Sequence, residues 1–384
     1  MDAMADHEFF TFMAERAAPW DPHDGTDLPF AGAAYIAAYL REFERHYVGT
    51  PLTFYVTHHT TALPRYGSDV VVVLLNDEWF RTPAYSGCVR AILRNLPLRP
   101  WFPWDTLFPV SGAGAFSLAN HLRVLVERRR SERNAEQVRR SRGWPPRRTD
   151  NSIDVPLGYY HQPEMAIKPL RQRRSDVFFA GSLLHDMQKA GWKRVVKRIV
   201  GNPKQTYRKA MMSELERFRA GHPDLRTKLT VSGDFRALGD TEVNSYAEAM
   251  MDARVALVPR GTAAESYRLF EAWRYGCIVV CEQLPPRSFL QGAPAITLRS
   301  WTELEPALES LMNDPDRQQA LHEASLAWWR DVCSEQVVGH RLASTLGRLD
   351  GPEPDAGSTK AMRPRRSAAS PTGAERVPRL DAVD

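Results

Sequence analysis

The sequence predicts an α/β fold with two doubly wound domains that face each other across a cleft. Continuous apolar runs such as DVVVVLLNDE (69–78) are typical of strands that helices cover on both faces of a parallel sheet. Strand-like and helix-like segments alternate along the chain, and the alternation restarts after a basic linker at 168–175. The length of 384 residues and a hydrophobic content of 43% allow two cores of ordinary size.

In the first half, residues 1 to about 50 are predicted to be helical, most clearly at 33–48, where apolar residues recur at helical spacing. The elements that follow are predicted as strands at 52–57 and 69–78, helices at 88–96 and 121–142, and an extended segment at 152–160.

In the second half, strands are predicted at 176–184, 227–234, 254–261, 277–281 and 294–299. Helices are predicted at 207–221, 241–253, 266–276, 301–313 and 315–346. Residues 350–384 lack any apolar period, so we expect them to be disordered. The expected organisation is therefore an N-terminal domain at 1–165, a second domain at 166–349 and a tail at 350–384.

Composition narrows the class of protein. The net charge is +5, and none of the four cysteines forms a CxxC pair, so neither a zinc ribbon nor a disulfide framework is expected. The acidic N-terminus does not resemble a signal peptide, and no window approaches the ~20 apolar residues that span a bilayer. We expect a soluble cytoplasmic protein.

The segment VPRGTAAESYRLFEAWRYGCIVV (258–280) holds polar residues between two strands. Ligands of an open parallel sheet bind outside the carboxyl ends of its strands, where this loop lies. Ser266 is a candidate N-cap, with Glu265 or the preceding turn as the alternative start of the helix, and a helix N-terminus attracts anions. Arg260 and Arg268 flank the helix start, and Gly261 lets the backbone approach a ligand. The loop therefore has the features of a phosphate site.

Glu271 lies one turn into the same helix, where it can accept hydrogen bonds from sugar or ribose hydroxyls. Alternatively, Arg268 and Glu271 form an exposed i,i+3 ion pair worth about 0.2–0.5 kcal/mol. The pattern alone does not separate these two interpretations.

The same segment resembles the signature of exostosin-type glycosyltransferases (family 47), which runs PRG, a polar loop, S-x-R-x-x-E/D-A and G-C-x-P-V. The matching residues are Pro259, Arg260, Gly261, Ser266, Arg268, Glu271, Ala272, Gly276, Cys277 and Val280. Val279 departs from the pattern, because the family usually has proline there. Weaker similarity extends over roughly 150–300.

This resemblance implies an inverting glycosyltransferase of the GT-B type, with a nucleotide-sugar donor, expected to be a UDP-sugar, as co-substrate. Ser266 and Arg268 would hold the pyrophosphate, and Glu271 the ribose or sugar hydroxyls. Gly181 and Ser182, which end the first strand of the second half, would let the backbone approach the donor phosphates. No metal and no cofactor are expected, since helix dipole and arginine neutralise the charge.

Inversion needs a general base on the acceptor hydroxyl, and we expect it in the first half. Asp77 and Glu78 follow a predicted strand, and the sequence does not separate them from each other or from a capping role. His58, beside His59, is a further candidate for the base or for an acceptor contact. A metal site there is disfavoured, because adjacent residues on a strand point to opposite faces.

The arginine-rich run Arg128–Arg148 has three interpretations: a solvated helix face, a contact with an anionic membrane surface, or a nucleic-acid contact. Only Trp144 supplies the aromatic interleaving that single-strand binding needs, so nucleic acid is not an expected partner. The expected partners are the donor and a glycan or other hydroxyl acceptor. A protein that binds a nucleotide-sugar or glycan without transfer is the alternative.

Overall fold

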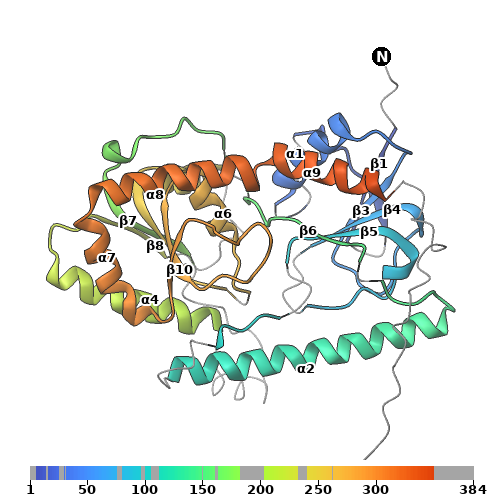
Figure 1. Ribbon diagram of the computed structural model, residues 1–384, viewed down its shortest axis with the longest axis horizontal. Coiled ribbons are helices and arrows are strands. Elements are labelled where there is room, and N and C mark those ends of the chain that lie inside the picture. The colour runs from blue at the N-terminus through green and yellow to red at the C-terminus, as the bar shows by residue number, and fades with distance from the viewer. Residues whose placement is uncertain are drawn as a thin grey trace, which may run out of the picture. The chain divides into compact units, whose positions relative to one another are not determined.

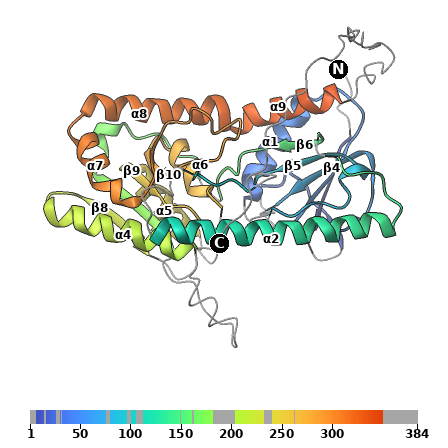
Figure 2. The same cartoon turned by 60° about the horizontal axis from the view of Figure 1, so that its bottom comes forward.

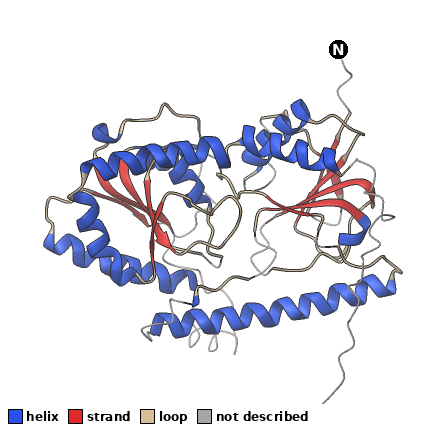
Figure 3. Ribbon diagram, viewed as in Figure 1, coloured by secondary structure: helices blue, strands red, loops and turns tan. Residues whose placement is uncertain are grey.

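A computed structural model of the chain shows two β-sheets with helices packed against them (Figures 1 and 3). It describes residues 6–13, 16–25, 30, 32–75, 80–96, 100–104, 112–148, 150–160, 163–181, 203–231, 240–261 and 263–349. The predicted α/β class with two parallel sheets is confirmed. The expected tail at 350–384 lies outside the described residues.

The first sheet has the strand order β2-β1-β3-β4-β5-β6, and all neighbours are parallel except β1 and β2. Its strands are β1 (Glu8–Phe12), β2 (Ala17–Pro19), β3 (Thr53–Thr57), β4 (Gly67–Leu74), β5 (Val89–Arg94) and β6 (Ser152–Asp154). β2 is the antiparallel neighbour of β1, and the parallel strands β1, β3, β4, β5 and β6 follow one another across the sheet in chain order.

Two predictions for the first half are wrong. Residues 8–12 and 17–19 are strands rather than helix. Phe9 stacks on Phe54 of β3 with ring centroids 5.0 Å apart, and aromatic cross-strand pairs stabilise a sheet. Residues 88–96 contain β5 rather than a helix. Leu93 packs into one core and Ile92 into another, so apolar residues occur on both faces. A short run of this kind has no period that separates strand from helix.

The second sheet is entirely parallel, with the order β11-β10-β9-β7-β8. Its strands are β7 (Ser175–Gly181), β8 (Thr227–Val231), β9 (Ala253–Val258), β10 (Ile278–Glu282) and β11 (Ala295–Leu298). Counted from β7, this is the doubly wound order 2-1-3-4-5, which reverses between β7 and β9. Ligands of such sheets bind at the carboxyl ends of the strands at the reversal.

Most of the helices lie close to the ranges that the sequence predicts. They are α1 (Ala33–His46), α2 (Gly112–Ser141), α4 (Pro203–Gly221), α5 (Asp240–Met251), α6 (Tyr267–Arg274), α7 (Leu304–Met312), α8 (Pro315–Trp328) and α9 (Glu335–Arg348). Short 3-10 turns are η1 (Ser86–Cys88), η3 (Leu170–Gln172) and η4 (Trp301–Glu303).

The single helix predicted at 315–346 is wrong, because a π-helical turn, η5 (Trp329–Cys333), separates α8 from α9. The Tyr35 hydroxyl donates a 2.6 Å hydrogen bond to the carbonyl oxygen of Cys333, which gives that oxygen a partner outside the helix. α9 then packs against α1 (Figure 2). At the contact, a Cβ on Gly339 would lie 2.6 Å from the carbonyl oxygen of Tyr39. The C-terminal helix therefore packs on the first half of the chain, and a boundary at 165/166 stays a prediction.

Candidate functional site

The candidate site is built on the loop between β9 and α6. β9 is apolar and buried, and it ends at Val258. Ser266 has extended backbone angles and begins α6. Gly276 ends the helix in the left-handed region, at φ 68°. The Cys277 and Gly276 N–H groups donate to the carbonyls of Ala272 and Trp273, which is a Schellman motif. The glycine of the signature thus terminates α6, and the other end of α6 lies at the switch point.

The N-terminus of α6 retains hydrogen-bonding capacity. Ser266 does not cap the helix with its side chain. Its Oγ is buried and has no hydrogen-bond partner among the residues that the structure describes. A buried hydroxyl without a partner costs free energy, which a ligand oxygen in hydrogen-bonding range would recover.

Arg268 and Gly181 meet at this end of the sheet. Arg268 lies in the first turn of α6 with 9% of its surface exposed, and its guanidinium carbon is 5.7 Å from the centre of the Phe179 ring. A Cβ on Gly181 would lie 2.8 Å from Arg268 Nη2. The missing side chain at the end of β7 therefore makes room for the guanidinium. Ser182, the other residue predicted there, lies outside the described residues.

Arg208 of α4 adds a second buried guanidinium that the sequence analysis missed. It is 3% exposed, and its pKa is lowered to about 9, first by burial and then by the positive charge of Arg268. The negative charge of Glu282, at the end of β10, acts to raise the pKa of Arg208. The sequence holds one indication of this burial, because Arg208 lies at helical spacing from Met211 and Leu215, which are buried on the same face of α4. A cation at a core position of a helix is a site for an anion or a carboxylate.

Arg260 belongs to the same cationic region. Its guanidinium carbon lies 5.2 Å from the centre of the Tyr207 ring, next to Arg208 in sequence. Its backbone N–H donates to Glu282 Oε2 at 2.8 Å, and Trp301 Nε1 donates to Glu282 Oε1 at 2.7 Å. These bonds hold the loop to β10. Gly261 follows, with its N–H bonded to the Ala263 carbonyl at 3.0 Å.

Glu271 is fully buried and connects α6 to the segment after β6. Its Oε1 accepts a 3.1 Å hydrogen bond from the Tyr160 backbone N–H, and its Oε2 accepts a 2.7 Å bond from the Tyr246 hydroxyl. Burial, followed by the charge of Glu271, raises the pKa of Tyr246 well above its usual value, so this hydroxyl stays protonated and donates. The alternative interpretation, an exposed ion pair between Arg268 and Glu271, is wrong, because both residues are buried. The contact of Glu271 with ribose or sugar hydroxyls stays a prediction.

A buried ion pair links the loop to the first half of the chain. Arg287 Nη1 lies 2.8 Å from Glu265 Oε2, and both side chains are almost fully buried. The same guanidinium donates to the carbonyl oxygens of Arg94 and Asn95, at the end of β5, and contacts Asp154 of β6 at 3.1 Å. Glu265 directly precedes the N-cap of α6, so this network fixes the start of the helix against the first sheet.

Of the candidate general bases predicted in the first half, the structure describes His58. Asp77 and Glu78 lie outside the described residues. His58 is exposed, and its ring stacks on His59 with centroids 4.5 Å apart. The expectation of opposite faces is wrong for these two histidines, because both follow the end of β3. Burial lowers the pKa of His58, and the positive charges of His59 and Arg81 lower it further.

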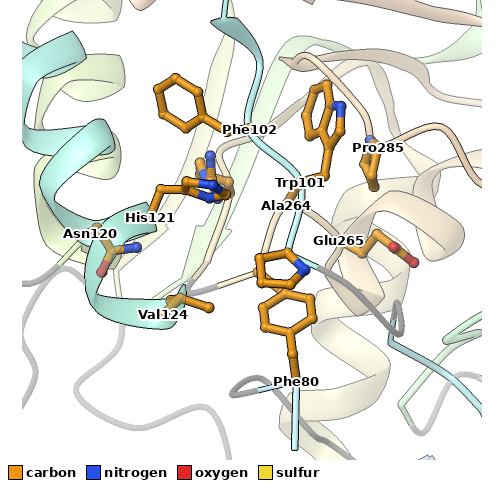
Figure 4. A pocket seen from close by; sticks show the side chains of 12 residues that line it. Phe80, Trp101, Phe102, Asn120, His121, Val124, Ala264, Glu265 and Pro285 are labelled. Carbon is orange, nitrogen blue, oxygen red and sulfur yellow. The ribbon is translucent and has the colours of Figure 1, made fainter. Parts of the chain in front are cut away.

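A pocket joins the loop to the aromatic connection after β5 (Figure 4). It is lined by Phe80, Pro100, Trp101, Phe102, Asn120, His121, Val124, Arg260, Ala263, Ala264, Glu265 and Pro285. The segment RPWFPWDTLFP contributes Trp101 and Phe102, and α2 contributes Asn120 and His121. An aromatic loop in a proline-rich connection commonly packs against a core, so the sequence did not reveal that this loop faces Arg260.

The arginine-rich run is largely paired along α2. The pairs within α2 are Arg128–Glu132 at 2.9 Å, Arg130–Glu127 at 3.1 Å, Arg140–Glu136 at 2.7 Å, and Arg139–Glu136. Beyond the end of α2, Arg147 pairs with Glu132 at 3.6 Å and Arg148 with Asp150 at 2.9 Å. Trp144 packs against Tyr66 and lies under Arg142, so its ring is engaged within the protein. These contacts favour a solvated helix face, and binding to an anionic membrane surface stays a prediction.

Two further findings concern metals and membranes. Within the described ranges, no group of three or more His, Cys, Asp or Glu side chains is placed to hold a metal ion. Among the helices of the described part of the chain, none is both long and apolar enough to cross a membrane.

Comparison with known proteins does not assign the chain to a family. No family model matches it, and no curated protein matches its sequence. The exostosin-type resemblance therefore rests on the residues of the 258–280 segment.

Solved structures show distant likeness. The chain is similar to the GtfA/B complex, with a TM-score of 0.39, 12% identity, and coverage of 74% of this chain and 58% of that chain. For the pneumococcal O-GlcNAc transferase GtfA in complex with UDP and GlcNAc the values are 0.36, 10%, 77% and 57%. For Anabaena HepE in complex with UDP-glucose they are 0.35, 9%, 82% and 75%. The chain thus spans less than three fifths of the first two, and likeness at these TM-scores does not identify an activity.

Proposed function

We propose that the chain is a glycosyltransferase of the GT-B type, which transfers a sugar from a nucleotide-sugar to a glycan or other hydroxyl acceptor. The observation that carries this proposal is the pair of buried guanidinium groups, Arg268 and Arg208, at the switch point of the second sheet. Burial and the positive charge of Arg268 both disfavour the charged form of Arg208, and a diphosphate bound next to these guanidinium groups would favour it.

The diphosphate of a UDP-sugar suits this site. Arg268 and Arg208 would pair with its oxygens, the Ser266 hydroxyl and the N-terminal N–H groups of α6 would donate to it, and Gly181 would allow its close approach. Arg260 and Gly261 would line the same phosphates, with Ser182 as a further predicted contact. In this proposal the arginines and the helix dipole neutralise the leaving group without a metal or a cofactor.

Several finer features belong to the same proposal. The donor is a UDP-sugar that carries a hexose or pentose, transfer proceeds with inversion as in exostosin-like enzymes, and Asp77, Glu78 or His58 contacts the acceptor. Glu271 holds the ribose or sugar hydroxyls while it also anchors Tyr160 and Tyr246.

UDP release is the test of transfer. The purified chain is incubated with UDP-glucose or UDP-N-acetylglucosamine and a panel of mono- and oligosaccharide acceptors, and released UDP and the glycosylated product are quantified. We expect product from the wild type and at least a 100-fold loss in Arg268→Ala. Asp77→Asn with Glu78→Gln should lose about 10²–10⁴-fold in turnover while it retains UDP binding, if either is the base. UDP binding without any product would indicate a non-catalytic nucleotide-sugar-binding protein instead.

A further inference from the structure

The pocket beside the donor loop combines apolar rings with groups that form hydrogen bonds. Phe80 and Phe102 are 7% and 5% exposed and form part of its wall, together with the Trp101 indole. Figure 4 shows Asn120 and His121 on α2 at one side and Glu265 at the opposite side. The pocket has a volume of about 30 Å³, so it admits a hydroxyl group of a sugar beside the amide and imidazole groups, and the rest of the sugar ring would lie outside it.

Arg260 places this pocket next to the proposed donor site. It lines the pocket and also packs on Tyr207, beside the buried Arg208. A sugar hydroxyl in the pocket would therefore lie on the first-half side of the diphosphate site. That is the side from which an acceptor oxygen would approach the donor sugar.

Among the side chains that line this pocket, His121 carries an imidazole that can accept a proton. Its ring lies 5.1 Å from the centre of the Phe102 ring. Burial lowers the pKa of His121, and the positive charge of Arg260 lowers it further. The charged groups that line the pocket with it are Arg260 and Glu265, and Glu265 is paired with Arg287. The imidazole is therefore neutral at pH 7 and has a lone pair for a proton.

We propose that the attacking hydroxyl group of the acceptor enters this pocket and that His121 accepts its proton. This inference rests on the proposed glycosyltransferase function and assigns a proton acceptor that the sequence analysis did not consider. The acceptor oxygen forms a bond to the anomeric carbon, the bond from that carbon to the diphosphate breaks, and the electron pair leaves with the nucleoside diphosphate. The hydroxyl proton moves to the imidazole and from there to solvent.

The test measures UDP binding and turnover separately in His121→Gln and His121→Ala. His340→Gln, an exposed histidine on α9, is the matched control. Turnover is measured as UDP release from UDP-glucose and UDP-N-acetylglucosamine between pH 5.5 and 9, with the acceptor panel present. UDP binding is measured by titration calorimetry on the same preparations.

We expect both His121 variants to bind UDP within twofold of the wild type and to lose at least 100-fold in turnover. Wild-type turnover should fall as the pH drops through a value below 6.5, this fall should be absent in His121→Gln, and added imidazole should restore part of the activity of His121→Ala. The control should behave as the wild type.

Three results would overturn the assignment. If His121→Gln keeps turnover within threefold of the wild type, or keeps the fall of turnover at low pH, another group accepts the proton. Loss of that fall in the Asp77→Asn/Glu78→Gln variant would assign the proton acceptor to Asp77 or Glu78. If the wild type binds UDP but forms no product, the role of His121 fails while the donor site stands. If the wild type does not bind UDP, the proposed function itself fails.

Discussion

The guanidinium of Arg268, in the first turn of α6, packs directly over Gly181, the last residue of β7. A Cβ on Gly181 would lie 2.8 Å from Nη2, which is closer than side-chain atoms pack. The two residues are far apart in sequence, and both were expected at the donor site. Their contact places the arginine at the reversal between β7 and β9, where a doubly wound sheet binds its ligand.

Gly181→Ala should therefore displace Arg268 and weaken UDP binding about 10-fold, which corresponds to roughly 1.4 kcal/mol. Binding of uridine, which has no phosphate, should change little. Gly221→Ala is the control, because no atom lies within 4 Å of a Cβ at that position. Titration calorimetry with both ligands checks the prediction. Equal UDP affinity in the Gly181 and Gly221 variants would show that the close packing does not position Arg268.

Arg208→Met should separate binding from stability. Removing a buried cation that sits near Arg268 relieves both desolvation and like-charge repulsion, so the melting temperature of the free protein should rise or stay unchanged. A charge-assisted hydrogen bond contributes about 1.5–3 kcal/mol, so UDP affinity should fall about 10- to 100-fold. Both quantities come from thermal unfolding with and without UDP.

Arg217→Met is the control for this prediction. Arg217 lies on the same helix, is largely exposed and pairs with Glu214 at 2.5 Å. It should leave both quantities near wild type. A lower melting temperature for Arg208→Met with unchanged UDP affinity would make Arg208 a structural residue and remove it from the site.

Arg287→Met should be strongly destabilising, by about 3–5 kcal/mol, because it leaves the buried carboxylate of Glu265 without its partner. Burial raises the pKa of Glu265, and Arg287 opposes this rise. Without Arg287 the folded protein binds a proton at Glu265 more tightly than the unfolded chain does, so its stability falls as the pH rises.

Urea unfolding at several pH values measures this effect. The deficit of Arg287→Met against the wild type should be smaller at pH 5 than at pH 8, and Glu265→Gln in the same chain should recover part of it. A deficit that does not depend on pH would mean that Glu265 is not the group left uncompensated.

The sequence predicted the second half of the chain well, because its strands are short, apolar and separated by regular helices. The order of strands could not be read from it, since pairing of β7 with β9 joins segments distant in sequence. The segment at 258–280 predicted a strand, a loop and a helix at 266–276. The structure has all three, but α6 ends at Arg274, and Gly276 lies beyond its end and not on its packing face.

The first half was predicted less well, for a physical reason. β5 carries apolar residues on both faces, so local spacing does not separate it from a helix, and contacts with β4 and β6 decide its structure. Arg208 and His121 could not be predicted as site residues for a similar reason. Each lies in an ordinary helical pattern, and only the folded chain brings it to Arg268 or Arg260.

The most direct test of the central claim is the thermal shift of the wild type and Arg268→Ala with UDP. At a concentration of about 100 times its dissociation constant, UDP should stabilise the wild type by roughly 2.7 kcal/mol, and uridine at the same concentration should have little effect. The Arg268→Ala protein should show a much smaller shift with UDP. An equal shift in both proteins, or no shift in the wild type, would contradict the assignment of a diphosphate site at the start of α6.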